Sequence, residues 1–257
     1  MINSTSNKQI KNLIQLQTKA KARREQQLYV VEGIRMYREI PKECLVKTYV
    51  SESFYNKEQN RAQLRGDETE VVADHVFAAV SDTKTPQGVL CVAKQQRYSL
   101  DDMLHTEKPL LMMLEDIQDP GNLGTILRTA EAAGVSGIIM SSGTADIYNP
   151  KTIRSTMGSL YRMPFMVTDD FTKTIHILQE KQVKIFAAYL TGSVEHTKAD
   201  YTSACAFLIG NEGNGLKKET AQIADSCVRI SMEGQVESLN AAIAATVLMF
   251  EAKRQRG

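Results

Sequence analysis

The sequence is poor in several features that would indicate other classes of protein. It contains no tryptophan and only four cysteines, Cys44, Cys91, Cys205 and Cys227. These form no C-x-x-C pair and no zinc-type spacing with the histidines, so we expect unpaired thiols and no metal. No apolar run approaches the ~20 residues that span a bilayer, and no N-terminal signal sequence is recognisable. The chain is therefore expected to be cytoplasmic, with no membrane as a partner.

Two phosphate-binding fingerprints are also missing. The glycine-rich stretch LIGNEGNGL at 208–216 matches neither G-x-G-x-x-G nor G-x-x-x-x-G-K. This absence weakens one hypothesis, that the chain is a nucleotide-dependent oxidoreductase on an ordinary Rossmann sheet.

The formal net charge of +1 conceals an uneven distribution of charge. Residues 1–100 contain 16 Lys and Arg against 11 Asp and Glu, whereas the remaining residues contain 15 against 19. The segment before Glu25 has cations and no acid, which would attract a polyanion, although a solvated helix face explains it equally well. The cations are Lys8, Lys11, Lys19, Lys21, Arg23 and Arg24.

Apolar periodicity divides the chain into two domains. Residues 9–28 are expected to form one basic helix, followed by alternating short strands and helices. The apolar pattern then lapses as far as Pro109, so we predict domains at 1–97 and 110–257 joined by a linker at 98–109.

The second domain alternates regularly between apolar strands and helices. This alternation predicts an α/β fold with a mostly parallel sheet covered on both faces. The strands are expected at 110–114, 137–142, 164–168, 183–190, 204–210 and 227–232, and the helices at 122–133, 149–160, 172–182, 215–224 and 238–254.

Ligands of such sheets bind at the carboxyl ends of the strands, where we expect three unusual loops. The first is LEDIQDPGNLGTILRTAEAAGV at 114–135. It has a Pro-Gly turn, Asn122 as a candidate N-cap, and Arg128 opposite the apolar face of the helix. An asparagine cap and an exposed arginine would also explain this loop without any ligand.

The second and third loops carry further polar residues. Glu212 lies among three glycines at 208–216, where a functional carboxylate and a helix-capping role are both consistent with the pattern. The stretch 229–254 enters a long apolar helix through Ser238, the expected cap, with Asn240 inside the helix. This helix is more apolar than one buried face requires. It predicts either a subunit interface with outward positions such as Met249, or core packing.

Taken together, the three loops resemble, in order and spacing, the three motifs of the SpoU or TrmH family of S-adenosylmethionine-dependent RNA ribose 2′-O-methyltransferases. The stretches VVEGIRMYREI at 30–40, SDTKTPQGVL at 81–90 and DIYNPKTIRSTMGSLYRMP at 146–164 also resemble family segments. The resemblance therefore covers nearly the whole chain. It implies a homodimer and a Rossmann-like, mostly parallel sheet with a C-terminal trefoil knot, preceded by a smaller N-terminal α/β domain that binds the RNA substrate.

The resemblance also implies roles for individual residues. The implied catalytic residues are Asn122, Arg128, Glu212, Ser238 and Asn240. S-adenosylmethionine would contact Thr191, Gly192, Gly210, Asn211, Gly215, Ile230, Met232, Ser238 and Leu239. RNA would contact the six N-terminal cations together with Arg35, Arg128 and Arg154. Ser231 stands where the family commonly has proline, which is a departure in the cofactor loop.

The resemblance thus implies methyl transfer from S-adenosylmethionine to a ribose 2′-hydroxyl of a structured RNA, with ribosomal RNA favoured by the two-domain layout. We expect Arg128 to clamp a phosphate, because a guanidinium stays protonated and is a poor base. Water, Glu212 and a phosphate oxygen are the candidates for proton removal. A transfer RNA methyltransferase and a non-catalytic RNA-binding protein that retains the fold are the alternatives.

Overall fold

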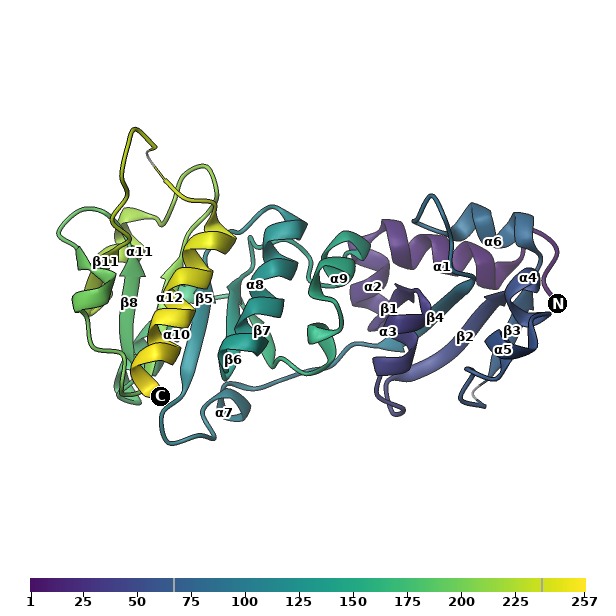
Figure 1. Cartoon of the computed structure of the whole chain (residues 1–257), viewed down its shortest axis with the longest axis horizontal. Helices are drawn as coiled ribbons and strands as arrows, with labels where there is room; N and C mark the ends of the chain where they lie inside the picture. Colours follow the sequence, from purple (N-terminus) through teal and green to yellow (C-terminus); the bar gives the residue numbers. More distant parts are fainter. Residues whose placement is uncertain (67, 237) are drawn as a thin grey trace. The chain divides into compact units, whose positions relative to one another are not determined.

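The computed structural model describes residues 1–66, 68–236 and 238–257, which form two compact units (Figure 1). The first unit comprises Met1–Gln96 and Asp146–Tyr161, and the second comprises Arg97–Ala145 and Arg162–Gly257. The domain boundaries expected from the sequence place residues 146–161 in the second domain. In the structure they pack with the first unit, because Asp146 pairs with Arg23 and the ring of Tyr148 contacts that of Tyr29.

The first unit is built on a four-stranded sheet in the order β1-β4-β2-β3. Its strands are β1 (Leu28–Glu32), β2 (Leu45–Ser51), β3 (Thr69–Val72) and β4 (Val89–Lys94). Strand β4 pairs antiparallel with β1 and β2, whereas β3 pairs parallel with β2. Its helices are α1 (Lys8–Thr18), α2 (Ala20–Gln26), α3 (Ile34–Glu39), α4 (Glu52–Tyr55), α5 (Glu58–Arg61), α6 (Asp74–Val80) and α9 (Pro150–Thr156), followed by η1 (Ser159–Tyr161).

The single basic helix expected at 9–28 is two helices, so that prediction was wrong. Lys19 has an extended backbone, and the Thr18 hydroxyl bonds back to the Ile14 carbonyl oxygen at 2.7 Å, which ends α1. The break lets α1 turn its apolar side chains Ile10, Leu13 and Leu16 onto the sheet beside α6, where they are buried in the core of this unit.

The second unit is built on a seven-stranded sheet in the order β7-β6-β5-β10-β8-β11-β9, in which all neighbouring strands are parallel. The strands are β5 (Leu110–Leu114), β6 (Gly137–Ser141), β7 (Phe165–Thr168), β8 (Lys184–Ala188), β9 (Val194–Glu195), β10 (Cys205–Ile209) and β11 (Ser226–Arg229). The six strands expected from the sequence are confirmed. The two-residue β9 was not expected, because it is too short to show a periodicity.

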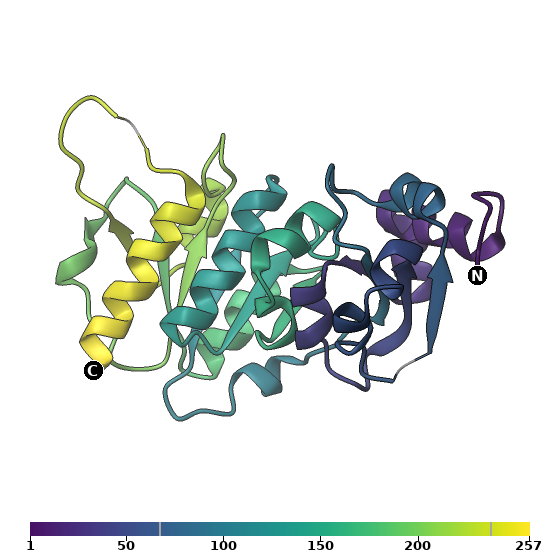
Figure 2. The same cartoon turned by 45° about the vertical axis from the view of Figure 1, so that its right-hand side comes forward.

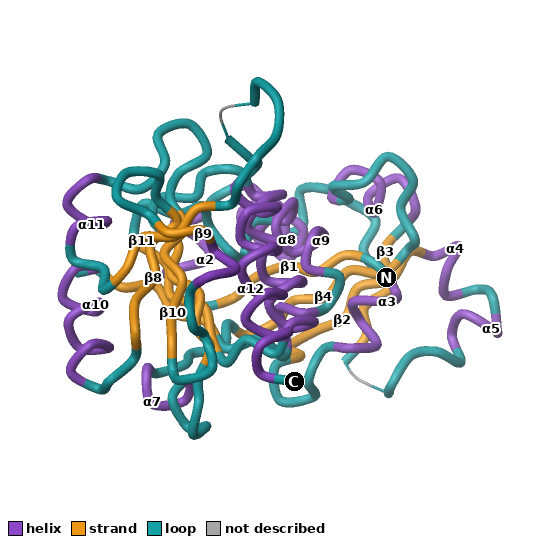
Figure 3. Tube along the Cα trace, turned by 60° about the vertical axis from the view of Figure 1, so that its left-hand side comes forward, coloured by secondary structure: helices purple, strands orange, loops and turns teal. Residues whose placement is uncertain are grey.

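Helices cover both faces of this sheet. They are α7 (Leu100–Met103), α8 (Pro120–Ala133), α10 (Phe171–Glu180), α11 (Lys218–Gln222) and α12 (Ala241–Arg256), with the short η2 (His196–Lys198) after β9. Helices α8 and α12 lie side by side on one face, and α10 and α11 lie on the other (Figures 1, 2 and 3). The strands β5, β6 and β10 are buried along their whole length, as expected for a covered parallel sheet.

Core packing accounts for most of the apolar excess in α12. Leu248 and Met249 are buried within the unit, so the expectation that Met249 points outward was wrong. Ile243 and Phe250 remain 51% and 43% exposed. They are seven residues apart and therefore share one face of the helix.

Two further findings concern the whole described chain. None of the helices in the described ranges is long and apolar enough to cross a bilayer. The four cysteines are unpaired, with three buried and Cys227 half-buried.

Candidate functional site

Helix α8 begins two residues earlier than expected. Asp119 is its N-cap, because its Oδ1 accepts a hydrogen bond from the Asn122 backbone N–H at 2.8 Å. Pro120 and Gly121 are therefore the first residues of the helix, and the expectation of a Pro-Gly turn capped by Asn122 was wrong. Since Asp119 caps the helix, the Asn122 side chain is free to contact other loops.

The loop after β10 folds back on itself at Gly210. A Cβ atom on Gly210 would lie 2.1 Å from backbone atoms of Gly215 and Leu216, so no other residue fits there. Asn211 and Gly215 exchange two backbone hydrogen bonds, of 3.1 and 2.8 Å, and Gly215 has a φ of +68° that favours glycine. This tight return places Glu212 at the tip of the loop.

Glu212 joins the second loop to the start of α8. Its Oε1 accepts hydrogen bonds from Asn122 Nδ2 at 2.9 Å and from the Asp119 backbone N–H at 3.0 Å, while Oε2 accepts one from the Gln118 N–H at 2.9 Å. Burial raises the pKa of this carboxyl, but the hydrogen bonds from Asn122 and the two N–H groups outweigh burial and hold the pKa below its ordinary value. Glu212 is therefore a charged acceptor with both oxygens occupied.

The third loop reaches the same place through Asn240. This residue, and not Ser238, is the N-cap of α12: Oδ1 accepts from the N–H groups of Ala242 and Ile243 at 2.9 and 3.3 Å. The helix starts at Ala241, later than expected, which leaves Ser238 too far away to be the cap. Asn240 Nδ2 also donates to Asn122 Oδ1 at 2.9 Å. The amides of Asn240 and Asn122 and the carboxylate of Glu212 thus form one continuous chain of hydrogen bonds.

A cavity of about 430 Å³ opens beside this chain at the carboxyl ends of the strands. The residues expected to bind cofactor that line it are Thr191, Gly210, Asn211, Gly215, Ile230, Met232, Ser238 and Leu239. Glu212 lines it too, whereas Gly192, Asn122, Arg128 and Asn240 are not among its described lining residues. The cavity is also lined by Tyr189, Leu190 and Arg229, which were not predicted. Their position at the ends of β8 and β11 is the signal that could have indicated them.

Arg128 is exposed on α8, on the side away from the buried residues Ile126, Leu127 and Ala130. Within residues 1–66, 68–236 and 238–257, its guanidinium makes no hydrogen bond or ion pair with another side chain. It is therefore available to an external ligand.

The N-terminal cations divide into two kinds. Lys8, Lys11, Lys19, Lys21 and Arg24 are exposed. Arg23 is only 2% exposed: its Nη2 lies 2.6 Å from Asp146 Oδ2, and its Nη1 donates to the Leu16 carbonyl oxygen at 2.7 Å. The structure thus removes Arg23 from the surface that a polyanion could reach.

Arg35 and Arg154, the other cations expected to contact RNA from the first unit, are exposed but paired. Arg35 Nε lies 3.5 Å from Glu39 Oε1, and Arg154 forms an ion pair with Asp82. Exposed pairs of this kind exchange readily with other anions.

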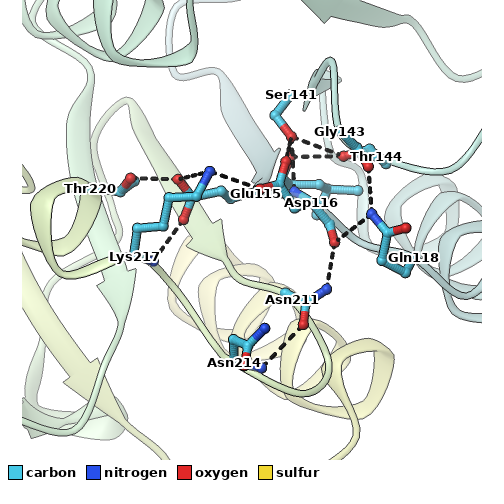
Figure 4. A network of polar contacts seen from close by, with 11 residues as sticks. Glu115, Asp116, Gln118, Ser141, Gly143, Thr144, Asn211, Asn214, Lys217 and Thr220 are labelled. Atoms are coloured by element: carbon cyan, nitrogen blue, oxygen red, sulfur yellow. Dashed lines mark hydrogen bonds and ion pairs between the residues drawn. The ribbon is translucent and has the colours of Figure 1, made fainter.

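A second polar network, around Glu115 and Asp116, was not expected from the sequence (Figure 4). It lies at the carboxyl end of β5 and includes Ser141, the last residue of β6, and Lys217, which precedes α11. The signal that could have indicated it is the pair of acidic residues directly after a buried strand. The structure shows no group of three or more His, Cys, Asp or Glu residues suited to a metal ion in the part of the chain that it describes.

Comparison with known proteins identifies the family. Residues 109–250 match the sequence model of the SpoU rRNA methylase family. The chain belongs to this family. Residues 7–91 match the model of the MRM3-like substrate binding domain, which covers most of the first unit.

Relatives match over nearly the full length of the chain. The 23S rRNA (guanosine(2553)-2'-O)-methyltransferase RlmP of Bacillus subtilis is 30% identical over 252 residues, which is 97% of either protein. The AdoMet-bound rRNA methyltransferase from Sinorhizobium meliloti has a TM-score of 0.86 and 32% identity, covering 98% of this chain and 97% of that one. The SpoU methyltransferase AviRb from Streptomyces viridochromogenes, in complex with AdoMet, has a TM-score of 0.87 and 27% identity, covering 97% and 98%.

Proposed function

We propose that this chain transfers a methyl group from S-adenosylmethionine to a ribose 2′-hydroxyl of ribosomal RNA. The observation that carries the proposal is the hydrogen-bonded chain of Asn240, Asn122 and Glu212 beside the 430 Å³ cavity. It unites all three motif loops at one point. The relatives are named as 2'-O-methyltransferases of 23S rRNA, which supports ribosomal RNA over transfer RNA as the substrate.

The cavity suits the proposed cofactor in size and in chemistry. Its volume falls within the roughly 300–1,000 Å³ of small-molecule sites, and it combines apolar side chains such as Leu190 and Ile230 with backbone exposed at Gly210 and Gly215. When bound, S-adenosylmethionine supplies a methyl group on a positively charged sulfur. The loops that end β8, β10 and β11 would hold it, since each contributes to the lining.

Glu212 is proposed to position the site and not to take the proton. A general base works best when its pKa lies near the working pH, whereas the pKa of Glu212 is lowered and both of its oxygens already accept hydrogen bonds. The proton of the ribose hydroxyl would pass to water or to a phosphate oxygen. Arg128 would clamp the phosphate of the target nucleotide and stabilise negative charge on the reacting oxygen.

The first unit is proposed to supply RNA affinity. Its exposed cations on α1 and α2, with Arg35 and Arg154, would contact phosphates, and the match to a substrate-binding model supports this role. Arg23 is left out because it is buried. Along the sequence we propose domains at 1–97 and 110–257, which the matched segments 7–91 and 109–250 support, with the exception that residues 146–161 pack with the first unit.

Two further features belong to the proposal. A C-terminal trefoil knot is supported by β10, which inserts between the earlier strands β5 and β8, and by α12, which packs back against α8. A homodimer is supported by the exposed apolar side chains of Ile243 and Phe250, which share one face of α12. Phe250→Glu should then yield a folded monomer in sedimentation experiments. A Phe250→Glu protein that sediments as the wild type does would exclude this face as the interface.

Mapping ribose methylation tests the reaction itself. Total RNA from cells with and without the gene should differ at a ribosomal ribose, and purified protein with labelled S-adenosylmethionine should restore that methyl group. Loss of a methyl group from transfer RNA alone would favour the alternative substrate. A protein that binds RNA without binding S-adenosylmethionine in calorimetry would be the non-catalytic alternative.

A further inference from the structure

The turn between β5 and α8 has an unusual backbone at Asp116. Its φ is +55°, a left-handed conformation that side chains other than glycine rarely adopt. Such a conformation persists only when the surroundings hold it in place. Here the Asp116 N–H donates to Ser141 Oγ at 2.8 Å, and that hydroxyl donates to Asp116 Oδ1 at 2.7 Å. Gly143 also packs so closely that a Cβ atom there would lie 2.1 Å from the same carboxylate oxygen.

Lys217 holds this turn from the other side (Figure 4). Its Nζ donates to Asp116 Oδ2 at 2.8 Å, and its backbone N–H donates to Oε2 of the buried Glu115 at 2.8 Å. Asn211 Nδ2 adds a hydrogen bond to the Asp116 carbonyl oxygen at 2.8 Å. The hydrogen bonds from Lys217 and then Ser141 lower the pKa of the Asp116 carboxyl, so it stays charged.

These contacts fasten both ends of the 210–217 loop to the turn that leads into α8. Asn211 and Glu212 make the attachments at the first end and tip of the loop, and Lys217 makes the attachment where the loop enters α11. The loop contributes a wall of the cavity, and α8 carries Asn122 and Arg128. Attachments at both ends fix the orientation of the loop relative to the helix, and loss of the Lys217 side-chain contact would loosen the end that enters α11.

We propose that Lys217 and Asp116 form a clasp that sets the position of α8 relative to the cofactor cavity. Lys217 is thus a positioning residue for methyl transfer, an inference that rests on the proposed function. A displacement of about 1 Å between reacting groups can reduce a rate by roughly a hundredfold. The clasp therefore matters to the rate more than to the stability of the fold.

Stability should depend little on the Lys217 ammonium group. Its side chain is 60% exposed, and exposed ion pairs contribute little to folding. If the ammonium is removed, Glu115 keeps the Lys217 backbone N–H and the Thr220 hydroxyl, which donates at 2.5 Å. A Lys217→Met protein is thus expected to fold, and it can be compared with Lys218→Met, which removes an exposed lysine from the neighbouring position.

The experiment measures S-adenosylmethionine affinity by calorimetry, and kcat and KM for RNA that lacks the ribosomal methyl group. Lys217→Met should lower kcat by about tenfold or more with unchanged cofactor affinity and RNA KM, Lys218→Met should match the wild type, and Lys217→Arg should recover most of the rate. The double variant Asp116→Asn with Lys217→Met should lower kcat no more than the more damaging of the two single changes. Both changes break the same contact, so their effects should not add. Hydrogen exchange at residues 115–122 should rise in Lys217→Met and stay at the wild-type level in Lys218→Met.

Two results would overturn the clasp. The first is a Lys217→Met protein with the wild-type kcat and the wild-type exchange at residues 115–122. The second is a rise in the RNA KM without a change in kcat, which would make Lys217 an RNA contact. A wild-type protein that neither binds S-adenosylmethionine nor transfers methyl would instead refute the proposed function, and the hydrogen-exchange comparison would still test the clasp.

Discussion

Two regions of the chain use their charged side chains in different ways: the loops at the carboxyl ends of the second sheet, and the basic segment 8–24 of the first unit. In the second unit, the carboxylates of Glu115, Asp116 and Glu212 each accept two or three hydrogen bonds from defined donors. In the first unit, Lys8, Lys11 and their basic neighbours on α1 and α2 extend into solvent, with Arg23 as the exception. A carboxylate whose two oxygens both accept hydrogen bonds holds the donor loops in one geometry, and methyl transfer requires such fixed positions. Exposed lysines supply a field that attracts a polyanion without fixing it.

The largest effect is expected at Arg128. Its side chain is an exposed cation, like those of the basic segment, but it lies on α8, the start of which is hydrogen-bonded to Glu212. Arg128→Ala should reduce methyl transfer by about 100-fold or more while cofactor affinity stays unchanged, because the residue does not line the cavity. Arg128→Lys keeps the charge but loses the bidentate fork, so a partial loss is expected. Single-turnover assays at saturating cofactor measure both. Full turnover by Arg128→Ala would contradict the proposed phosphate clamp.

A smaller loss is expected when the carboxylate of Glu212 is removed. Glu212→Ala leaves the N–H groups of Gln118 and Asp119 and the amide of Asn122 without their acceptor, so the start of α8 should shift. We expect the rate to fall on the order of tenfold. The dependence of the rate on pH should keep the shape that it has in the wild type. Glu180→Ala, at an exposed position on α10, is the matched control. A change in the shape of the profile would indicate that Glu212 is the base after all.

The parallel sheet and the meeting of the three loops could be predicted because both follow from simple patterns. Strands such as LLMML and CAFLI are continuous apolar runs, and the carboxyl ends of parallel strands lie along one edge. The helix starts could not be placed, because Ser238 and Asn240 are both good caps by type. The contact of Asn240 with Asn122, distant in the sequence, favours the second of them.

The clasp and the burial of Arg23 could not be predicted for a related reason. Lys217 and Arg23 look like ordinary surface cations, and only their partners Asp116 and Asp146, each about a hundred residues away in the chain, distinguish them. Asp146 also lies in the segment 146–161, which packs with the first unit although the residues before it, 97–145, belong to the second. Local periodicity contains no information about such a return.

The next prediction concerns the exposed cations of the segment 8–24, which lie on α1, on α2 and between them. Changing Lys8, Lys11, Lys19, Lys21 and Arg24 together to glutamine should weaken RNA binding and reduce its salt dependence by up to about 0.7–0.9 logarithmic units per lost phosphate contact. Filter binding between low and moderate salt would measure the slope, and cofactor affinity should stay constant. An unchanged slope would leave these residues as a solvated helix face.

Arg23→Gln is the contrasting variant in the same helix. Because its guanidinium is buried against Asp146 and the Leu16 carbonyl oxygen, the change should lower the melting temperature and leave the salt slope nearly as it was. The opposite outcome, a stable protein with a reduced slope, would place Arg23 on the RNA-binding surface.

The smallest effect is expected at Glu251 on α12, whose carboxylate also accepts hydrogen bonds on both oxygens but does not line the cavity. Hydrogen bonds from Arg254, at 2.8 and 2.7 Å, together with one from Gln255 at 2.8 Å, lower its pKa to about 2. A carboxyl with a lowered pKa in the folded state adds stability above its unfolded pKa of about 4.3, and this stability is lost as the pH falls towards the folded value. Glu251→Gln should therefore melt a few degrees below the wild type at neutral pH, on the order of 2–4 °C. The difference should shrink as the pH falls from about 4.3 towards 2, which melting curves of both proteins across that range would show. Methyl transfer at neutral pH should be unchanged. A loss of methyl transfer without a loss of stability would contradict this prediction. It would mean that Glu251, like Glu212, positions the site.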